Sequence, residues 1–284
     1  MDGKLILVGT PIGNLSDISE RAIEALRNAD FIAAEDTRVT LKLLNHFGIK
    51  NNMISYYEHN KKEKGNVILN RIVNGETCVL VSDAGMPAIS DPGEDLVRKC
   101  IDSGIQDSVI PGPCAAISAL AISGLGTGRF TFEGFLSMNR KNRSQHLQSL
   151  ERETRTMIFY EAPHKFKHTL MDMFDVFGDR KISIVREITK IHEEVIHTSF
   201  KSAIERFNEE NIRGEIVLIV EGYTCNESED IKNYSISDAI KFVKKFQSEG
   251  LKYTDAVKKT AKLTGLNRSL IYKNALYVGE QYEK

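Results

Sequence analysis

The chain has 284 residues and a formal net charge of −1 at pH 7; 41% of its residues are hydrophobic and 27% are charged. This length exceeds the usual size of one domain, and the composition is typical of an ordinary folded protein rather than a disordered or membrane chain. The beginning of the chain lacks the basic flank and long apolar core of a signal peptide, and no run approaches a membrane span. The four cysteines form no CxxC pair, so we expect reduced thiols and a cytoplasmic protein.

The first half of the chain alternates β-rich runs with amphipathic stretches. The order is KLILVG, ERAIEALRNA, DFIAAED and VTLKLLNHFG, and later TCVLVSDAG and EDLVRKCIDSG. This alternation is typical of βαβ units on a mainly parallel sheet. A further strand ends at the Pro-Gly-Pro turn of residues 111–113, and the small-residue run after it indicates a buried helix that stops at Gly124. We therefore predict an N-terminal α/β domain over residues 1–125.

A second α/β series follows, and we assign it to a domain over residues 126–224. It opens with FTFEGFL and a polar, basic stretch, SMNRKNRSQHLQSLERETR. The strands expected after that are TMIFYEAP, KISIVREIT, EEVIHTSF and EIVLIVEG, with helices in HKFKHTLMDMFDVFG and SAIERFNEEN. KISIVREIT and EEVIHTSF have no helix between them, which predicts an antiparallel pair near residues 184–199 and hence a mixed sheet.

The last segment, residues 231–284, is predicted to be a helical and basic appendage. It follows a polar linker, NESEDIKN, and contains eleven Lys and Arg against five Asp and Glu, a net charge of +6. Its last two helices are joined by a short turn through Gly265 and Asn267, and Asn267 or Ser269 can cap the final helix. Such a pair resembles a helix-turn-helix, although a plain helical hairpin has similar spacing. The charge suits contact with phosphates or, equally, a solvated lysine-rich face.

Five loops that follow predicted strands are rich in Gly, Pro, Asp and Glu: residues 9–14, 35–38, 82–87, 90–93 and 111–113. Ligands of open α/β sheets bind beyond the carboxyl ends of strands, where glycines let the backbone approach. One such loop would be an ordinary turn, but five together indicate a ligand cleft. The pattern GTPIGN lacks the GK[ST] ending of a P-loop and no GxGxxG follows the first strand, which argues against Walker ATPases and dinucleotide enzymes. His192 and His197 are five positions apart, not four as HExxH requires, so we expect no metal site.

Eight motifs, in order, resemble those of the tetrapyrrole methylase superfamily. They are GTPIGNLSDISERA, AEDTR, LVSDAGMPAISDPG, IPGPCAAISAL, FEGFL, FYEAPHK, REITKIHEE and GEIVLIVEG, and the resemblance as a whole spans essentially residues 4 to 222. Within the superfamily they resemble the branch that 2′-O-methylates a cytidine in the decoding region of small-subunit (16S) ribosomal RNA. AEDTR, YEAPHK and REITK distinguish this branch, whereas precorrin-type members share only the Gly-Pro loops. The C-terminal segment also resembles the small helix-turn-helix appendage of this branch.

The resemblance implies a bilobal α/β fold with S-adenosyl-L-methionine in the cleft between two α/β domains, a small all-α C-terminal appendage, and a homodimer that acts on ribosomal RNA or the small ribosomal subunit. The cofactor-binding residues that it implies are Asp83, Gly85, Met86, Pro87, Pro111, Gly112 and Ala115 in the first domain, and Tyr160, Ile188, Gly214 and Ile216 in the second. Asp83 and Glu161 would supply negative potential for a sulfonium cation. Met86 and Ile216 would sandwich adenine or, just as well, belong to the core.

Methyl transfer to a ribose hydroxyl is an in-line substitution, so positioning supplies much of the rate. A base, or a cation that stabilises the developing alkoxide, would help. The candidate bases are Asp36 and Glu161, and the candidate cations are Arg38 and Lys190. Asp36 and Arg38 could instead form only a surface ion pair, and Lys190 could be merely solvated.

A histidine and a basic cluster are further candidates for contact with the substrate. His164 is another candidate base, or else an exposed loop histidine. Arg140, Lys141 and Arg143 contact phosphates in one interpretation and belong to a flexible solvated loop in the other.

Two other functions stay open on the sequence alone. A methyltransferase acting on a tetrapyrrole or corrin precursor should lack the basic appendage and the cluster at Arg140. A non-catalytic RNA-binding protein would have no reason to keep Gly and Pro loops around a cleft.

Overall fold

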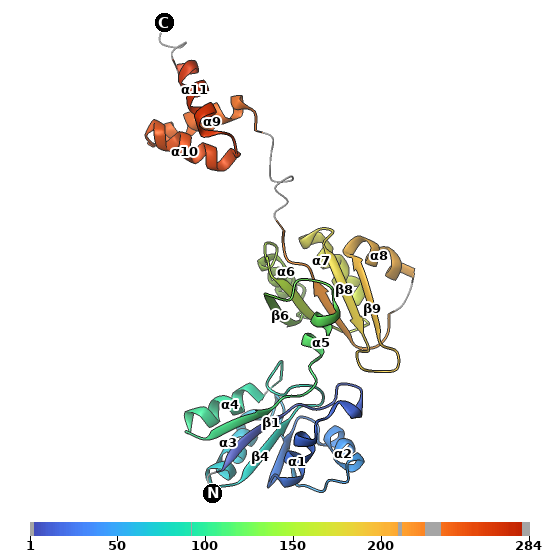
Figure 1. Cartoon of the computed structure of the whole chain (residues 1–284). Helices are drawn as coiled ribbons and strands as arrows, with labels where there is room; N and C mark the ends of the chain where they lie inside the picture. Colours follow the sequence, from blue (N-terminus) through green and yellow to red (C-terminus); the bar gives the residue numbers. More distant parts are fainter. Residues whose placement is uncertain (1–2, 92, 210–211, 225–233, 280–284) are drawn as a thin grey trace. The chain divides into compact units, whose positions relative to one another are not determined.

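A computed structural model describes residues 3–91, 93–209, 212–224 and 234–279 (Figure 1). The chain divides into two compact units, residues 1–223 and residues 224–284. The larger unit contains two five-stranded sheets with their helices, and the smaller unit is helical. This confirms the predicted α/β fold with a helical C-terminal appendage. Among the described residues no helix is long and apolar enough to cross a membrane.

The first sheet is entirely parallel, with the strand order β3-β2-β4-β1-β5. Its strands are β1 (Lys4–Val8), β2 (Phe31–Ala34), β3 (Met53–Ser55), β4 (Thr77–Val81) and β5 (Gln106–Ile110). Its helices are α1 (Glu20–Asn28), α2 (Thr37–His46), α3 (Lys61–Val73) and α4 (Gly93–Asp102). Parallel strands need helical crossovers, and these βαβ units place helices on both faces of the sheet.

Alternation along the strands builds two apolar layers. Leu80 of β4 packs with α3 and α4, whereas Val79 and Val81 pack with α1 and α2. Side chains of a strand point to opposite faces in turn, so a strand covered on both faces is apolar throughout. Because β1, β2 and β4 run parallel, their carboxyl ends lie at the same edge of the sheet, and the loops that follow them start there.

The second sheet is mixed, as the sequence predicts, with the order β6-β7-β10-β8-β9. Its strands are β6 (Phe130–Phe135), β7 (Thr156–Glu161), β8 (Lys181–Arg186), β9 (Glu194–Ser199) and β10 (Ile216–Val220). Only β6 and β7 pair in parallel. The predicted antiparallel pair is β8 with β9, where Ile184 faces Ile196.

Different helices cover the two faces of the second sheet. One face packs on α6 (Arg140–Ser149), α7 (Phe166–Phe177) and α8 (Phe200–Glu209). The opposite face packs on α5 (Ala115–Ile122), whose Ala116, Ala119 and Leu120 are buried against it. Thus α5, which follows the first sheet in the chain, packs on the second. The division of the larger unit at residue 125 stays a prediction.

The basic stretch after β6 is a helix, so the interpretation of Arg140, Lys141 and Arg143 as a flexible loop is wrong. The Asn139 side chain accepts hydrogen bonds from the backbone N–H groups of Lys141 (3.0 Å) and Asn142 (3.2 Å) and so caps α6. Arg143 forms an ion pair with Asp172 of α7 at 2.6 Å, which fixes one of the three cations within the fold.

The described part of the smaller unit, residues 234–279, contains three helices: α9 (Ile236–Ser248), α10 (Tyr253–Thr264) and α11 (Arg268–Gly279). Ser235 and Asp238 form a capping box at the start of α9. Gly265 ends α10 in the left-handed conformation, and the Asn267 side chain accepts from the Ser269 N–H at 2.9 Å, so Asn267 is the cap of α11. The three helices share a core. The predicted linker NESEDIKN, residues 226–233, lies outside the described residues.

Candidate active site

The loops after β1 and β4 are joined backbone to backbone. The Thr10 N–H donates to the Gly85 carbonyl oxygen at 2.9 Å, and the Gly85 N–H donates to the Thr10 carbonyl oxygen at 3.1 Å. Gly85 has φ = 85°, a conformation that side chains with a Cβ rarely adopt. A Cβ there would lie 3.5 Å from Ile12 Cγ2 and 3.6 Å from the Pro113 carbonyl oxygen, which are ordinary van der Waals distances, so it is the left-handed backbone that favours glycine at this position.

A second glycine contact lies where the loops after β1 and β5 cross. A Cβ on Gly112 would lie 2.8 Å from Gly9 Cα, so both positions need glycine for this approach. The Gly112 N–H also donates to the Met86 sulfur at 3.3 Å. The structure thus brings together Gly85, Met86 and Gly112 of the sequence-predicted site, with Pro87 and Pro111 directly beside them in the chain.

Carboxylates gather at the ends of β2 and β4. The Asp36 N–H donates to Asp83 Oδ1 at 2.9 Å, and the Asp83 N–H donates to Glu35 Oε2 at 3.3 Å. Burial raises the pKa of Asp83, outweighing the hydrogen bond from the Asp36 N–H. Burial likewise raises the pKa of Glu35, and the charges of Asp83, Asp91 and Asp36 raise it further against a lowering hydrogen bond from the Asp83 N–H.

Asp36 and Arg38 form a bidentate pair. Arg38 Nε lies 3.0 Å from Asp36 Oδ1, and its Nη2 lies 2.6 Å from Oδ2. Asp36 also caps α2 by accepting from the Arg38 N–H at 2.8 Å. The side-chain hydrogen bonds from Arg38 are the main cause that lowers the pKa of Asp36 to about 2. Such a carboxylate is a weak base near neutral pH, so in this geometry Asp36 positions Arg38.

Backbone strain is concentrated in two loops. Ala88 and Ser90 have φ values of 67° and 65°, and the Asp91 carboxylate accepts from the Ala88 and Gly93 N–H groups at 2.8 Å each. Glu187 and Thr189, in the loop after β8, have φ values of 51° and 66°. Non-glycine residues in this region cost energy and cluster at ligand sites, which marks both loops as candidates for function.

Lys190 lies across the loop after β1. A Cβ on Gly13 would lie 2.5 Å from Lys190 Cγ, so the absence of a side chain at Gly13 lets Lys190 pass. Lys190 Nζ is paired with Glu187 Oε1 at 2.9 Å and Glu215 Oε2 at 3.2 Å. Burial disfavours its charge, but the hydrogen bonds to these two carboxylates outweigh burial and raise the pKa of Lys190.

Gly214 supports the same arrangement. A Cβ at Gly214, which has φ = 86°, would overlap the Glu187 side chain. The structure therefore groups Lys190 and Gly214 around Glu187, a residue that the sequence analysis missed. The interpretation of Lys190 as merely solvated is wrong.

Tyr160 meets the first turn of α5. Its hydroxyl oxygen accepts from the Ala116 N–H at 3.2 Å, one of the N–H groups that a helix start leaves without a partner. Burial raises the pKa of the Tyr160 hydroxyl, which keeps it protonated near neutral pH. Ala115 and Ile188 pack against the same apolar cluster, so three predicted site residues share this face of the second sheet.

Glu161 and Ile216 lie on the opposite face. Ile216 pairs with Glu161 in the sheet and belongs to the core formed with α7 and α8. Glu161 is 4% exposed, and its carboxylate accepts from the Ala162 N–H at 2.7 Å and from Thr169 Oγ1 at 2.5 Å. The structure therefore does not bring these two side chains to the α5 side with Tyr160. Ile216 is a core residue, and Glu161 anchors the start of the loop after β7.

Sequence reasoning missed Glu35, Thr10 and Glu187 as site residues. The first two lay in motifs that it singled out. The motif AEDTR contains two acidic residues, however, and the sequence does not show which of them directs its carboxylate to Asp83. Glu187 also lay in such a motif, REITKIHEE, but its positive φ and its contacts with Glu215 and Lys190 are visible only in the structure.

Comparison with known proteins decides the family. The family described as "Tetrapyrrole (Corrin/Porphyrin) Methylases" matches residues 4–204. The chain belongs to this family. A relative from Halalkalibacterium halodurans named "Ribosomal RNA small subunit methyltransferase I" is 46% identical over 271 residues, which are 95% of this chain and 93% of the relative. A protein of the same name from Escherichia coli O157:H7 is 42% identical over 277 residues, 96% of this chain and 95% of that one.

A third relative of this name is shorter. The protein from Thermotoga maritima is 46% identical over 220 residues, which are 99% of that protein but 78% of this chain. The rest of this chain therefore has no counterpart in it.

Solved structures of low identity share the fold. Uroporphyrin-III-C-methyltransferase from Thermus thermophilus, in a complex with S-adenosyl homocysteine, superposes with a TM-score of 0.55 at 17% identity, covering 77% of this chain and 97% of that chain. Diphthine synthase gives a TM-score of 0.58 at 16% identity, covering 80% and 92%. At such identities the likeness shows the fold alone.

Proposed function

We propose that the chain is an S-adenosylmethionine-dependent methyltransferase that modifies small-subunit ribosomal RNA, on the 2′-hydroxyl of a cytidine near the decoding centre. The observation that carries the proposal is the left-handed glycine at position 85, two residues after Asp83 in the loop after β4, in a chain of which one relative, 46% identical, bears the name of a ribosomal RNA methyltransferase. A cationic ligand with a planar ring and an amino acid part suits glycine loops beside carboxylates.

The residues present fit that cofactor. Gly85 leaves a space that a Cβ would enter, the Pro113 carbonyl oxygen borders that space, and Asp83 stands two residues before it. S-adenosylmethionine, when bound, supplies a methyl group on a positively charged sulfur. The loops at Gly85 and Gly112 bind it, while Tyr160, Ala115 and Ile188 exclude water from the α5 side of the second sheet in this proposal.

The chain's own residues then orient and activate the ribose hydroxyl. Lys190 is held as a cation by Glu187 and Glu215, which suits stabilisation of a developing alkoxide. Asp36 fixes Arg38 as a second cation. Glu35, whose pKa is raised, accepts the proton more readily than Asp36, and Glu161 acts by holding its loop rather than as the base.

Basic surfaces support an RNA substrate over a corrin precursor. A pocket of about 420 Å³ is lined by Pro163, Ile212, Gly214 and four nitrogen-bearing side chains, His164, Lys167, His168 and Arg213. The described part of the smaller unit carries eight lysines and one arginine against three acidic residues. Such groups bind phosphates without reading sequence. In this proposal His164 contacts RNA rather than serving as the base.

A cytoplasmic homodimer completes the proposal. The edge strand β5 exposes 52% of Val109, and Ile101 at the end of α4 is 60% exposed. Exposed edges and apolar side chains of this kind are commonly covered by a partner, here a second copy.

The test is methyl transfer from tritiated S-adenosylmethionine to small ribosomal subunits, to free 16S ribosomal RNA and to a tetrapyrrole precursor. We expect transfer to ribosomal RNA, with one position becoming resistant to alkaline cleavage because a 2′-O-methyl group removes the attacking hydroxyl. Transfer to the tetrapyrrole alone would favour the corrin-type enzyme. Cofactor-independent RNA binding without transfer would favour the non-catalytic protein.

A further inference from the structure

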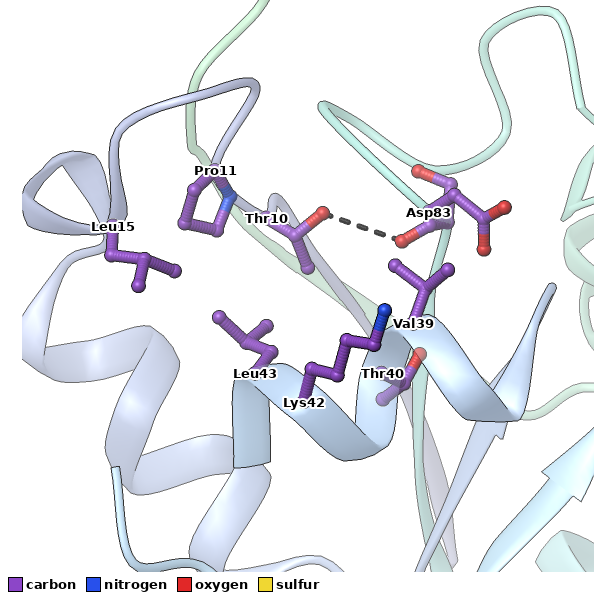
Figure 2. Close-up of a pocket in the computed structure, with 9 residues that line it drawn as sticks. Thr10, Pro11, Leu15, Val39, Thr40, Lys42, Leu43 and Asp83 are labelled. Carbon is purple, nitrogen blue, oxygen red and sulfur yellow. Dashed lines mark hydrogen bonds between the residues drawn. The ribbon is translucent and has the colours of Figure 1, made fainter. Parts of the chain in front are cut away.

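A pocket of about 230 Å³ lies between the loop after β1 and helix α2, and among its lining residues it shares only Asp83 with the proposed cofactor site (Figure 2). Its sides are apolar, formed by Pro11, Leu15, Val39 and Leu43. Its polar end is formed by Thr10 and Asp83. Val39 and Leu43 are one turn apart on α2, so the pocket lies along one face of that helix.

The pocket shares a wall with the proposed cofactor loop. The backbone of Thr10 is hydrogen-bonded in both directions to Gly85, while its side chain lines the pocket and donates to the Ser82 carbonyl oxygen at 3.3 Å (Figure 2). Thr10 is 3% exposed, so this wall is fixed by buried hydrogen bonds. A group held in the pocket would therefore contact Thr10, the residue whose backbone is hydrogen-bonded to Gly85.

The size and polarity of the pocket fit one planar ring. Drug-sized ligands occupy roughly 300–1,000 Å³, so 230 Å³ suits a single-ring base and is too small for a macrocycle. Apolar sides favour the faces of such a ring, and a carboxylate at the end accepts hydrogen bonds from the amino group of cytosine. Asp83 Oδ1 already accepts from the Asp36 N–H, and among the described residues no donor contacts Oδ2.

A cation stands at the rim. Lys42 lines the pocket, and its ammonium group points toward the Asp83 side in Figure 2. Within the described residues Lys42 has no ion-pair partner, whereas Arg38, four residues earlier on α2, is paired with Asp36. An unpaired ammonium beside a ring-sized pocket suits the phosphate of the same nucleotide.

We propose that this pocket receives the unstacked cytosine ring of the nucleotide that is methylated, with Asp83 accepting from its amino group and Lys42 contacting its phosphate. The inference rests on the proposed function and names how the acceptor is held. Enzymes that act on one nucleotide commonly take its base out of the stack and read it in a pocket. The ribose of a base so held is presented to the adjoining cofactor loop.

The first test fills the pocket with Val39→Phe and uses Leu41→Phe as a matched control. Leu41 is on the same helix, is 46% exposed against 38% for Val39, and does not line the pocket. Because misplacement by about 1 Å costs about 100-fold in rate, we expect V39F to lower kcat/KM for ribosomal RNA about 100-fold. S-adenosylmethionine affinity by calorimetry should match that of L41F.

Equal rates for V39F and L41F, in a wild type that methylates ribosomal RNA, would overturn the pocket assignment alone. A wild type without transfer to ribosomal RNA would overturn the proposed function and this inference with it.

A second test, independent of packing, removes the cation. Lys42→Ala should raise KM for ribosomal RNA and lower the slope of log affinity against log salt by about 1, because one phosphate contact is lost. Lys62→Ala, which removes an exposed lysine of α3 that does not line the pocket, is the control. Identical behaviour of K42A and K62A contradicts the phosphate contact.

The third test concerns recognition of the amino group. Wild-type protein should methylate subunits with uridine at the target position at least about tenfold more slowly than subunits with cytidine. Asp83→Asn should narrow that ratio, since an amide can either donate or accept. The ratio is insensitive to any change in cofactor affinity, which affects both substrates alike. An unchanged ratio in D83N means that Asp83 does not read the base.

Discussion

Gly85 and Gly104 share a left-handed backbone conformation but differ in what a Cβ would meet at each position. Both have positive φ, 85° and 68°, and a Cβ would be tolerated sterically at Gly104, where nothing lies within 4 Å. At Gly85 the Cβ would occupy the space bordered by Ile12 and Pro113. Backbone strain is therefore common to both positions, whereas only the Cβ at Gly85 would lie beside the proposed cofactor loop's neighbours Ile12 and Pro113.

We expect Gly85→Val to abolish S-adenosylmethionine binding while Gly104→Val retains it. Each variant carries a strain of about 1–3 kcal/mol, so both should remain folded at reduced stability. Isothermal calorimetry with thermal melting as the fold control measures this. Equal affinities in the two variants would exclude the Gly85 loop from the cofactor site.

Lys190→Ala should lower kcat about 100- to 1,000-fold and leave S-adenosylmethionine affinity near that of the wild type. This is the usual result of removing one group that stabilises developing negative charge. Lys181→Ala, at an exposed lysine that begins β8, provides the control. Loss of cofactor affinity with normal turnover at saturation would instead identify Lys190 as a binding residue.

Glu35 provides a prediction about pH. Its folded-state pKa is raised above the ordinary value of 4.5, chiefly by burial, so ionisation is less favourable in the folded protein than in the unfolded chain. The loss of folding stability that results is absent below the pKa of Glu35 in the unfolded chain and grows as the pH rises through its pKa in the folded protein. Glu35→Gln should therefore raise the melting temperature at pH 7 but not at pH 4. A variant less stable than wild type at pH 7 would show that the Glu35 charge is compensated.

The elements show how far the sequence determines the fold. Mostly apolar strands such as β4 and β10 were predicted because a strand buried on both faces is apolar throughout, and amphipathic helices such as α1 because burial of one face gives their apolar residues a helical period. Four elements were missed, and the first of them is the three-residue 3-10 helix η1 (Leu15–Asp17). β3 is three residues long, α3 begins with a run of lysines and contains Gly65, and α6 buries only Leu147. Such elements are stabilised mainly by their neighbours in space.

The candidate site was predictable to a similar extent. The glycine-rich loops at the strand ends could be predicted from the sequence because positive φ values and close backbone contacts there favour glycine. Tyr160 and Glu161 are adjacent on β7 and must face opposite sides, but which side meets α5 is set by packing that no local pattern reveals.

Leu120 of α5 tests the packing that fixes Tyr160. Leu120 is 3% exposed against the second sheet, whereas Ile122 on the same helix is 42% exposed. Leu120→Ala should cost about 2–5 kcal/mol and Ile122→Ala within about 0.5 kcal/mol, measured by chemical denaturation. Similar losses for both variants would contradict the packing of α5 described above.

At the scale of the whole molecule, the two units have separate cores. The smaller unit packs Val243, Val257 and Ile271 among its own helices. The chain from Thermotoga maritima, matched over 99% of its length by 78% of this one, shows that a relative of the same name exists without a counterpart for the remainder.

Deletion of residues 231–284 should weaken RNA binding and flatten its salt dependence while S-adenosylmethionine affinity persists. The segment carries a net charge of +6, and phosphate contacts release counterions. RNA affinity at two salt concentrations, together with thermal melting, measures the effect. An unchanged salt slope in a well-folded truncation would exclude a role in RNA positioning, and a lowered melting temperature would mean that the helices stabilise the larger unit.

The paired hydrogen bonds between Thr10 and Gly85 have a thermodynamic consequence. Thr10 borders both the proposed cofactor loop and the ring-sized pocket, so a displacement of this residue by one ligand would change the site of the other. Coupling between two binding equilibria is reciprocal: the factor by which RNA tightens cofactor binding must equal the factor by which the cofactor tightens RNA binding.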